Sequence, residues 1–320
     1  MNSYDALLRK LYALTLFQKV KPSLANTLLL HEACGSPATS FKSIHIAGTN
    51  GKGSVSLKIA KALQYSGFKV GLYTSPHIAS FRERIAVNGE PISEKEACSY
   101  LERLFAIAEQ QLLKPTFFEL TTIMAFHAFA EQKVDFAVVE TGLGGRLDAT
   151  NIITPILTLI TSIGLDHCHI LGDALEEIAS EKAGIIKQGV PLVLGPKAIY
   201  NAIVQRAQEK KALLIQAPHS PHPFYDQENS LTAESALLHL KKEIPITYAA
   251  IAKALKERPK CRLEILSCGS ATVVLDAAHN PPAFEKLASA LHHHFPQKKF
   301  RFLLGFSSDK DIQGCLEKRR

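Results

Sequence analysis

The hydrophobic pattern changes repeatedly between two periods from Ser43 onward. Short runs rich in β-branched residues alternate with longer stretches whose apolar positions recur at helical spacing. The short runs, which we predict as strands, are residues 43–47, 69–74, 134–140, 156–161, 190–194 and 213–216. The predicted helices are residues 51–66, 93–112, 118–132, 175–187 and 196–211. This alternation predicts an α/β fold in which helices cover both faces of a mostly parallel sheet.

A second, shorter unit follows a connector. Residues 217–227 are rich in proline and histidine and lack periodicity, so we expect a loop there. Beyond it, the predicted helices are residues 228–242, 247–257, 282–295 and one from Lys310, and the predicted strands are residues 261–267, 272–276 and 300–304. We place a domain boundary near residue 258, which divides the chain into residues 1–257 and 258–320. The second unit is short, so we predict a smaller, incomplete Rossmann-like α/β domain.

Composition narrows the class of protein. No apolar run in the 320 residues approaches the roughly 20 needed to span a bilayer, and the first residues do not resemble a signal peptide. We therefore expect a cytoplasmic protein with no membrane partner, whose six scattered cysteines are free thiols. The net charge of +7 is spread along the chain. This diffuse excess favours acidic small substrates over nucleic acid, and we expect a monomer.

One loop has the composition of a phosphate-binding loop. The segment from Ala47 to Ser54 reads Ala-Gly-Thr-Asn-Gly-Lys-Gly-Ser and lies between a predicted strand and a predicted helix. Glycines let backbone N–H groups approach phosphate oxygens, a helix N-terminus favours negative charge, and a lysine reaches the outer phosphates. The standard pattern is not matched strictly, because Ile46 replaces its first glycine and an extra glycine precedes Ser54. A plain glycine-rich turn is the alternative. The residues predicted to bind nucleotide here are Asn50, Gly51, Lys52, Gly53 and Ser54.

Three further predicted strands end in or are followed by polar residues, and the first of these residues suits a metal ion. Glu140 ends an apolar strand before a glycine-rich loop, where a hard cation bridging phosphates needs an oxygen ligand. Ser75, in Thr-Ser-Pro-His, follows another strand, although a proline-ordered turn is an alternative interpretation. His167 begins a third loop, and the spacing of His167-Cys168-His169 suits neither a zinc finger nor a helical histidine pair.

Taken together, these segments resemble the folylpolyglutamate synthase and dihydrofolate synthase branch of the Mur ligase superfamily. Gly-Thr-Asn-Gly-Lys-Gly-Ser is similar to the family's phosphate loop, and residues 141–151 (TGLGGRLDATN) match the family almost letter for letter. Residues 275–281 (LDAAHNP) resemble its Asp-Gly-Ala-His-Asn-Pro block, with alanine for glycine. The resemblance runs from about Ser43 to Ile312, and family members continue beyond it. It implies a P-loop-containing sheet domain of the Mur ligase central-domain type.

The resemblance also implies a metal centre. In the family, counterparts of Ser75, Glu140 and His167 hold two magnesium ions, with His167 at the second. Lys182, in Glu-Lys-Ala-Gly, corresponds to a lysine that carbon dioxide converts to a carbamate. That chemistry needs an amine whose pKa is lowered enough to leave a neutral fraction.

The remaining implied positions concern the substrates. Residues 116–122 resemble the family's pterin-pocket segment, in which aromatic rings stack on a flat heterocycle, although the start of a core helix is an almost equally good interpretation. The implied acid-binding residues are Phe117, Phe118, Glu119, Leu120, Leu147, Asp148 and Ala149. The implied nucleotide-binding residues beyond the loop are Asn229, Arg262 and Asp276, and the implied catalytic residues are Lys52, Lys182 and His279.

The implied activity is that of a bifunctional dihydrofolate synthase and folylpolyglutamate synthase. Such an enzyme uses ATP and Mg²⁺ to activate the carboxylate of dihydropteroate or a reduced folate as an acyl phosphate, which the amine of L-glutamate then displaces. Two alternatives stay open at this point. A muropeptide ligase shares the loop and the reaction type, and a shortened nucleotide-binding remnant would bind ATP without catalysis.

Overall fold

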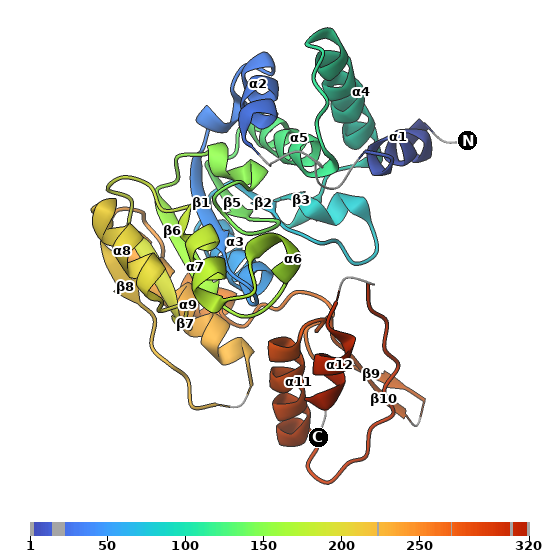
Figure 1. Cartoon of the computed structure of the whole chain (residues 1–320), viewed down its shortest axis with the longest axis vertical. Coiled ribbons are helices and arrows are strands. Elements are labelled where there is room, and N and C mark those ends of the chain that lie inside the picture. The colour runs from blue at the N-terminus through green and yellow to red at the C-terminus, as the bar shows by residue number, and fades with distance from the viewer. Residues whose placement is uncertain (1–2, 15–22, 223, 270, 308–309, 319–320) are drawn as a thin grey trace.

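A twisted eight-stranded sheet forms the centre of the computed structural model, which describes residues 3–14, 23–222, 224–269, 271–307 and 310–318. The strand order is β4-β3-β2-β5-β1-β6-β7-β8 (Figure 1). The parallel strands are β1 (Lys42–Ala47), β2 (Val70–Tyr73), β5 (Phe136–Glu140), β6 (Leu157–Ser162), β7 (Leu192–Lys197) and β8 (Leu214–Gln216). Two short antiparallel strands, β3 (Ile85–Val87) and β4 (Glu90–Pro91), extend one edge. The predicted α/β class with a mostly parallel sheet is confirmed.

Helices cover both faces because neighbouring residues of each strand point to opposite sides. On one face, Val138 of β5 packs with α3 (Lys52–Tyr65), α9 (Asp226–Leu240) and α10 (Tyr248–Ala254). On the other face, Val139 packs with the helices that precede and flank β5. These helices are α1 (Ser3–Tyr12), α2 (Ala25–Ala33), α4 (Glu94–Gln110) and α5 (Phe117–Glu131). Further along the same face, α7 (Leu175–Ala183) and α8 (Asn201–Glu209) cover β6 and β7.

Several predicted boundaries need correction. Residues 196–197 belong to β7 and not to the following helix, because Lys197 continues the parallel ladder opposite Ser162. The helix predicted to reach residue 187 ends at Ala183. The helices α1 and α2 and the strands β3 and β4 were not predicted. Each is short or weakly periodic and is held in place by packing on the sheet or its helices.

The segment after α10 forms a small separate layer (Figure 1). It contains an antiparallel pair, β9 (Glu264–Cys268) and β10 (Ala271–Leu275), followed by α11 (Pro281–His294) and α12 (Ile312–Glu317). The strand predicted at residues 300–304 is wrong, since these residues pair with no strand in the described part of the chain and Leu303 is 100% exposed. An apolar run becomes a strand only where a neighbour accepts its backbone hydrogen bonds. The division at residues 257 and 258 stays a proposal, and it falls between α10 and β9.

The described helices include none long and apolar enough to cross a membrane. All six cysteines have free thiols. The carboxyl ends of the parallel strands meet at one edge of the sheet, which is where open α/β sheets bind ligands. The loops after β1, β2, β5 and β6 therefore converge there, and the start of α11 and Lys310 lie beside them.

Candidate active site

The loop between β1 and α3 is shaped by close contacts that only glycine permits. A Cβ atom on Gly48 would lie 1.9 Å from the Thr161 hydroxyl, and one on Gly51, which has a φ of 87°, would lie 2.3 Å from the Asn229 amide oxygen. The hydroxyl of Thr161 donates a hydrogen bond to the Asn50 carbonyl at 2.7 Å. The loop is thus fixed against β6 and α9, and its residues face a cavity. The loop and helix residues that line this cavity are Gly48, Thr49, Asn50, Gly51, Lys52, Gly53 and Ser54.

Lys52 occupies the first position of α3 and bends back over the loop. Its Nζ donates hydrogen bonds to the carbonyl oxygens of Gly48, at 3.0 Å, and Thr49, at 3.3 Å. The same nitrogen lies 3.9 Å from Glu140 Oε1. Its positive charge therefore sits at the mouth of the loop, in the place where a lysine meets the outer phosphates of a bound nucleotide.

Glu140 is a buried carboxylate at the end of β5, only 3% exposed. Its Oε2 accepts a hydrogen bond from the backbone N–H of Ser75 at 3.2 Å. Burial raises the pKa of Glu140 to about 7, against the opposing effect of nearby Lys52. A neighbouring cation would favour the ionised form, so this carboxylate, which lines the cavity together with Ser75, fits a hard metal ion that completes its coordination with phosphate oxygens and water.

Lys182 is the second buried lysine of the cavity. It lies on α7, is 4% exposed, and donates a hydrogen bond from Nζ to the Gly48 carbonyl at 3.0 Å. Burial, followed by repulsion from Lys52, lowers the pKa of Lys182 to about 7. At pH 7 the Lys182 amine is then neutral in about half of the molecules, and the neutral amine is the nucleophilic form.

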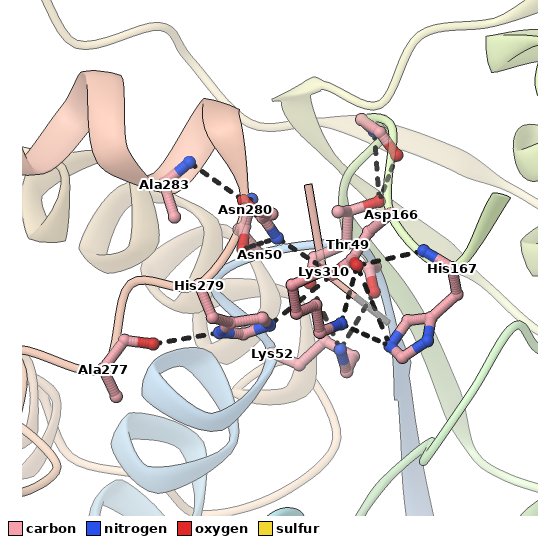
Figure 2. A network of polar contacts seen from close by, with 12 residues as sticks. Thr49, Asn50, Lys52, Asp166, His167, Ala277, His279, Asn280, Ala283 and Lys310 are labelled. Atoms are coloured by element: carbon pink, nitrogen blue, oxygen red, sulfur yellow. Dashed lines mark hydrogen bonds and ion pairs between the residues drawn. The ribbon is translucent and has the colours of Figure 1, made fainter. Parts of the chain in front are cut away.

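Asp166 joins the sheet edge to the C-terminal segment (Figure 2). Lys310 Nζ lies 2.8 Å from Asp166 Oδ1 and 3.1 Å from His167 Nε2. On the other oxygen, Asn280 Nδ2 donates at 2.9 Å and His279 Nε2 lies at 3.5 Å. Burial alone would raise the pKa of Asp166, but these donors hold it well below its usual range.

An amide pair forms the second contact between these parts of the chain. The side chains of Asn50 and Asn280 exchange two hydrogen bonds of 3.1 Å, and Asn280 also caps α11 by accepting from the Ala283 N–H at 3.0 Å. The motif search assigned no role to Asp166, Asn280 or Lys310. Asn280 lies in the segment 275–281 that resembles the family, but no local pattern predicts the contact itself, because these residues are brought together across more than a hundred positions of the chain.

The predicted metal-site residues Ser75, Glu140 and His167 all line the first cavity. His167 contacts Lys310, whereas Glu140 faces Ser75 and Lys52. Within the described ranges, no group of three or more His, Cys, Asp or Glu side chains is arranged to hold a metal ion. Magnesium commonly binds through one or two protein oxygens together with substrate phosphates, so the Glu140 side suits it better than a closed protein site would.

A second cavity adjoins the first on the α9 side. Asn229 on α9, Arg262 and Asp276 all line it, as the sequence-based prediction requires of a nucleotide pocket. The carboxylate of Asp276 is already engaged, since it accepts hydrogen bonds from Tyr225 Oη at 2.7 Å and from the backbone N–H of Leu263 at 2.8 Å. The residues shared by the two cavities are Asn50, Gly51, Ser54, Arg262 and His279.

The predicted acid-binding residues differ in how far they are accessible. Phe117 stacks on Tyr12, with ring centres 5.7 Å apart, and Phe118 lies against Gly142 of the glycine-rich loop. Glu119 is tied up locally, because it accepts from the Thr116 N–H at 2.7 Å in a capping box at the start of α5. Leu120 lies fully inside the core. Phe117 is thus buried in the core at 4% exposure, Phe118 is partly buried against the glycine-rich loop, and neither lines the cavity beside the phosphate loop.

Asp148 organises the loop after β5. It accepts hydrogen bonds from the backbone N–H groups of Gly142 and Leu143, each at 2.9 Å, and burial raises its pKa. Ala149 is buried beside it and Leu147 is partly exposed. Asp148 thus fixes the glycine-rich loop, in which Gly142 lies against Phe118.

Comparison with known proteins identifies the family. The Mur ligase middle domain model matches residues 46–244. The dihydrofolate synthase/folylpolyglutamate synthase of Bacillus subtilis is 36% identical, over 93% of this chain and 79% of its own length. The chain belongs to this family of ligases.

Solved structures of family members extend the agreement to the fold. The Escherichia coli FolC structure in complex with DHPP and ADP has a TM-score of 0.89 and 30% identity, over 98% of this chain and 80% of its own. A bifunctional folylpolyglutamate synthase/dihydrofolate synthase with Mn, AMPPNP and L-glutamate bound has a TM-score of 0.87 and 31% identity, over 99% and 80%. Membership makes the chain an ATP-dependent ligase of the folate type, which confirms the sequence-based assignment.

Proposed function

We propose that this chain ligates L-glutamate to the carboxylate of dihydropteroate and of reduced folates, with ATP as the energy source and an acyl phosphate as the intermediate. The observation that carries the proposal is the convergence of Lys52, Glu140 and Lys182 on the phosphate loop in one cavity. A second cavity adjoins the first at Arg262, and this arrangement supports a nucleotide that lies across both cavities.

The nucleotide roles follow from these positions. The N–H groups of residues 50–54 at the start of α3 suit the phosphates, and Lys52 suits the outermost one. Asn229, Arg262 and Asp276 suit the base and sugar. Since Asp276 already holds Tyr225, we assign it mainly to shaping this pocket.

Magnesium fits the Glu140 carboxylate and the Ser75 hydroxyl, and when bound it supplies neutralisation of the phosphate charge. For the second ion we assign His167, whose ring nitrogen Lys310 contacts in this structure. The carboxylated form of Lys182 would add an anion next to Lys52. The lowered pKa of Lys182 supports that modification.

The two chemical steps balance as follows. A carboxylate oxygen attacks the γ-phosphorus, the bond to the bridging oxygen breaks, and ADP leaves. The neutral amine of glutamate then attacks the acyl carbon, and the bond from that carbon to the phosphate oxygen breaks, which releases inorganic phosphate. The amine nitrogen finally loses a proton. Lys52 and the loop N–H groups stabilise the transferred phosphoryl group, while His279, beside Asp166, faces the incoming glutamate.

A single assay tests the proposal against both alternatives. Purified chain is incubated with Mg²⁺, ATP and radiolabelled L-glutamate, together with dihydropteroate, tetrahydrofolate or a muropeptide acceptor. We expect label in an amide product, with release of ADP, for the two pteroate-type acids only. Incorporation into the muropeptide would establish the other ligase class. Saturable ATP binding without phosphate release in any reaction would establish a non-catalytic nucleotide-binding protein.

The cytoplasmic location, the monomeric state and the absence of nucleic-acid or membrane partners stay predictions. Light scattering during the assay checks the monomeric state.

A further inference from the structure

Arg84 is a buried cation at the sheet edge that the assignments above leave without a role. It ends the short turn η2 (Phe81–Arg84), and its carbonyl accepts from the Thr74 N–H at 3.0 Å, directly beside the end of β2. The residue is 8% exposed. The next residue along from Thr74 is Ser75, whose N–H binds Glu140, so Arg84 lies at the same edge as the proposed metal site.

The plane of the guanidinium is fixed from two directions. Its Nε donates a hydrogen bond to His77 Nδ1 at 2.8 Å, and the group lies over the Phe117 ring, 5.2 Å from the ring centre. Phe117 is itself stacked on Tyr12, whose outer side is 48% exposed. The orientation of the guanidinium is therefore set by contacts at both its edge and its face.

In the described ranges, the two terminal nitrogens of Arg84 form no hydrogen bond or ion pair. Among the residues that the structure describes, none places a carboxylate within ion-pair distance of Arg84 or an acceptor against these nitrogens. Neither nitrogen is sealed from solvent, unlike the Nε of neighbouring Arg82, which is buried without a partner. Burial lowers the pKa of Arg84, and a nearly buried charge normally has a counter-ion. Glu140 is a nearby opposite charge beyond ion-pair distance, so the two terminal nitrogens are open to a second anion from outside the described residues.

We propose that Arg84 binds the carboxylate of the acid substrate that is to be phosphorylated, through its two terminal nitrogens. The planar fork of an arginine matches a carboxylate with two parallel hydrogen bonds. The stacked rings of Tyr12 and Phe117 lie on one side for a flat aromatic acid, and Glu140 lies close enough for Arg84 to lower its pKa. His77 acts as a positioning residue. This assignment rests on the proposed function, since it names the residue that holds its acid.

The test compares a carboxylic acid with its carboxamide. Direct binding of pteroic acid and pteroic acid amide is measured by fluorescence quenching in the presence of Mg²⁺ and AMPPNP. Pteroic acid has only one carboxylate, so a preference over the amide reports on the reacting group. We expect the wild type to prefer the acid by about tenfold to a hundredfold, and Arg84→Met to bind both alike with unchanged nucleotide affinity. Arg82→Met is the matched control, because Arg82 lies in the same turn and donates to the Ile92 carbonyl instead.

Each outcome decides the assignment. Retention of the acid preference by Arg84→Met overturns it, and so does a selective loss of AMPPNP affinity, which would assign Arg84 to the nucleotide. If Arg84→Met does not fold, Arg84→Lys decides, since it keeps the charge without the fork. Weaker binding of the acid by about tenfold, with the amide unaffected, supports the assignment, and wild-type discrimination overturns it. Acid preference in a wild type that makes no amide product would instead contradict the proposed function alone.

Discussion

Replacing Lys182 by methionine separates two consequences of burying an amine beside another cation. In the folded chain burial and Lys52 lower the pKa of Lys182 to about 7 from 10.5. This difference in pKa means that folding destabilises the ammonium form by about 5 kcal/mol relative to the neutral amine. The folded state avoids this cost only by releasing the proton. At pH 7 an ordinary lysine is neutral in less than about 0.1% of molecules, whereas about half of Lys182 is neutral. The pool of reactive amine is larger by about a thousandfold.

The first expected result concerns stability. Because the folded pKa lies below the unfolded one, the unfolded chain binds more protons between pH 7 and 10.5, so wild-type stability rises with pH across that window. Methionine has no proton to lose. Lys182→Met should therefore raise the free energy of unfolding by a few kcal/mol near pH 7, with an advantage that shrinks toward pH 10. Urea unfolding of protein freed of carbon dioxide measures this difference.

The second expected result concerns the carbamate. Wild-type protein in ¹³C-bicarbonate should give a carbamate carbon resonance that weakens as the pH falls below about 7, since the ammonium form cannot react. Lys182→Met should lack the resonance and lose turnover by about a hundredfold or more. Equal stability of the two proteins at every pH, together with an identical ¹³C spectrum, would refute the reasoning.

Other expected outcomes concern the loop and its contact with the C-terminal segment. Lys52→Ala should lower kcat by about a hundredfold to a thousandfold with little change in Tm, because its Nζ makes two hydrogen bonds to loop carbonyls and only a long ion pair with Glu140; steady-state rates at wild-type level would contradict its role. Gly48→Ala should cost about 1–3 kcal/mol of stability and abolish ATP binding, since the new Cβ would lie 1.9 Å from the Thr161 hydroxyl. Gly67→Ala is the control: its Cβ would have no atom within 4 Å, so this variant should retain ATP binding in the same ATP titration. In a double-mutant cycle by urea unfolding, Asn280→Ala and Asn50→Ala should show a coupling of about 0.5–3 kcal/mol, and simple additivity would argue against the amide pair in solution.

The local signals for the phosphate loop were readable from sequence because they reside in the backbone. A glycine such as Gly51 is required wherever the chain turns from a strand into a helix with a positive φ, and the requirement is written in adjacent residues. The mostly parallel character of the sheet follows in the same way from alternating periods, whereas the order of its strands was not predicted. These features therefore survived comparison with the structure.

The contact between the sheet edge and the C-terminal segment was not readable in this way. Asp166 meets Asn280 and Lys310 only because separate elements pack together, and none of the three residues has a neighbour pattern that announces the contact. The strand expected at residues 300–304 failed for a related reason. Its apolar run was real, but strand formation depends on a partner that sequence periodicity does not supply.

Because the contact between Asn50 and Asn280 is uncharged, a change in ionic strength can weaken nucleotide binding without weakening this contact. Neutral side chains attract each other without net charge, and the nearby bond from Lys310 to Asp166 is largely shielded from solvent, so added salt leaves both nearly unchanged. The attraction between ATP and the cations at the open cavity is screened much more strongly. A fall in rate with added potassium chloride would thus report on capture of the nucleotide, while the alignment of the two segments stays constant across the titration.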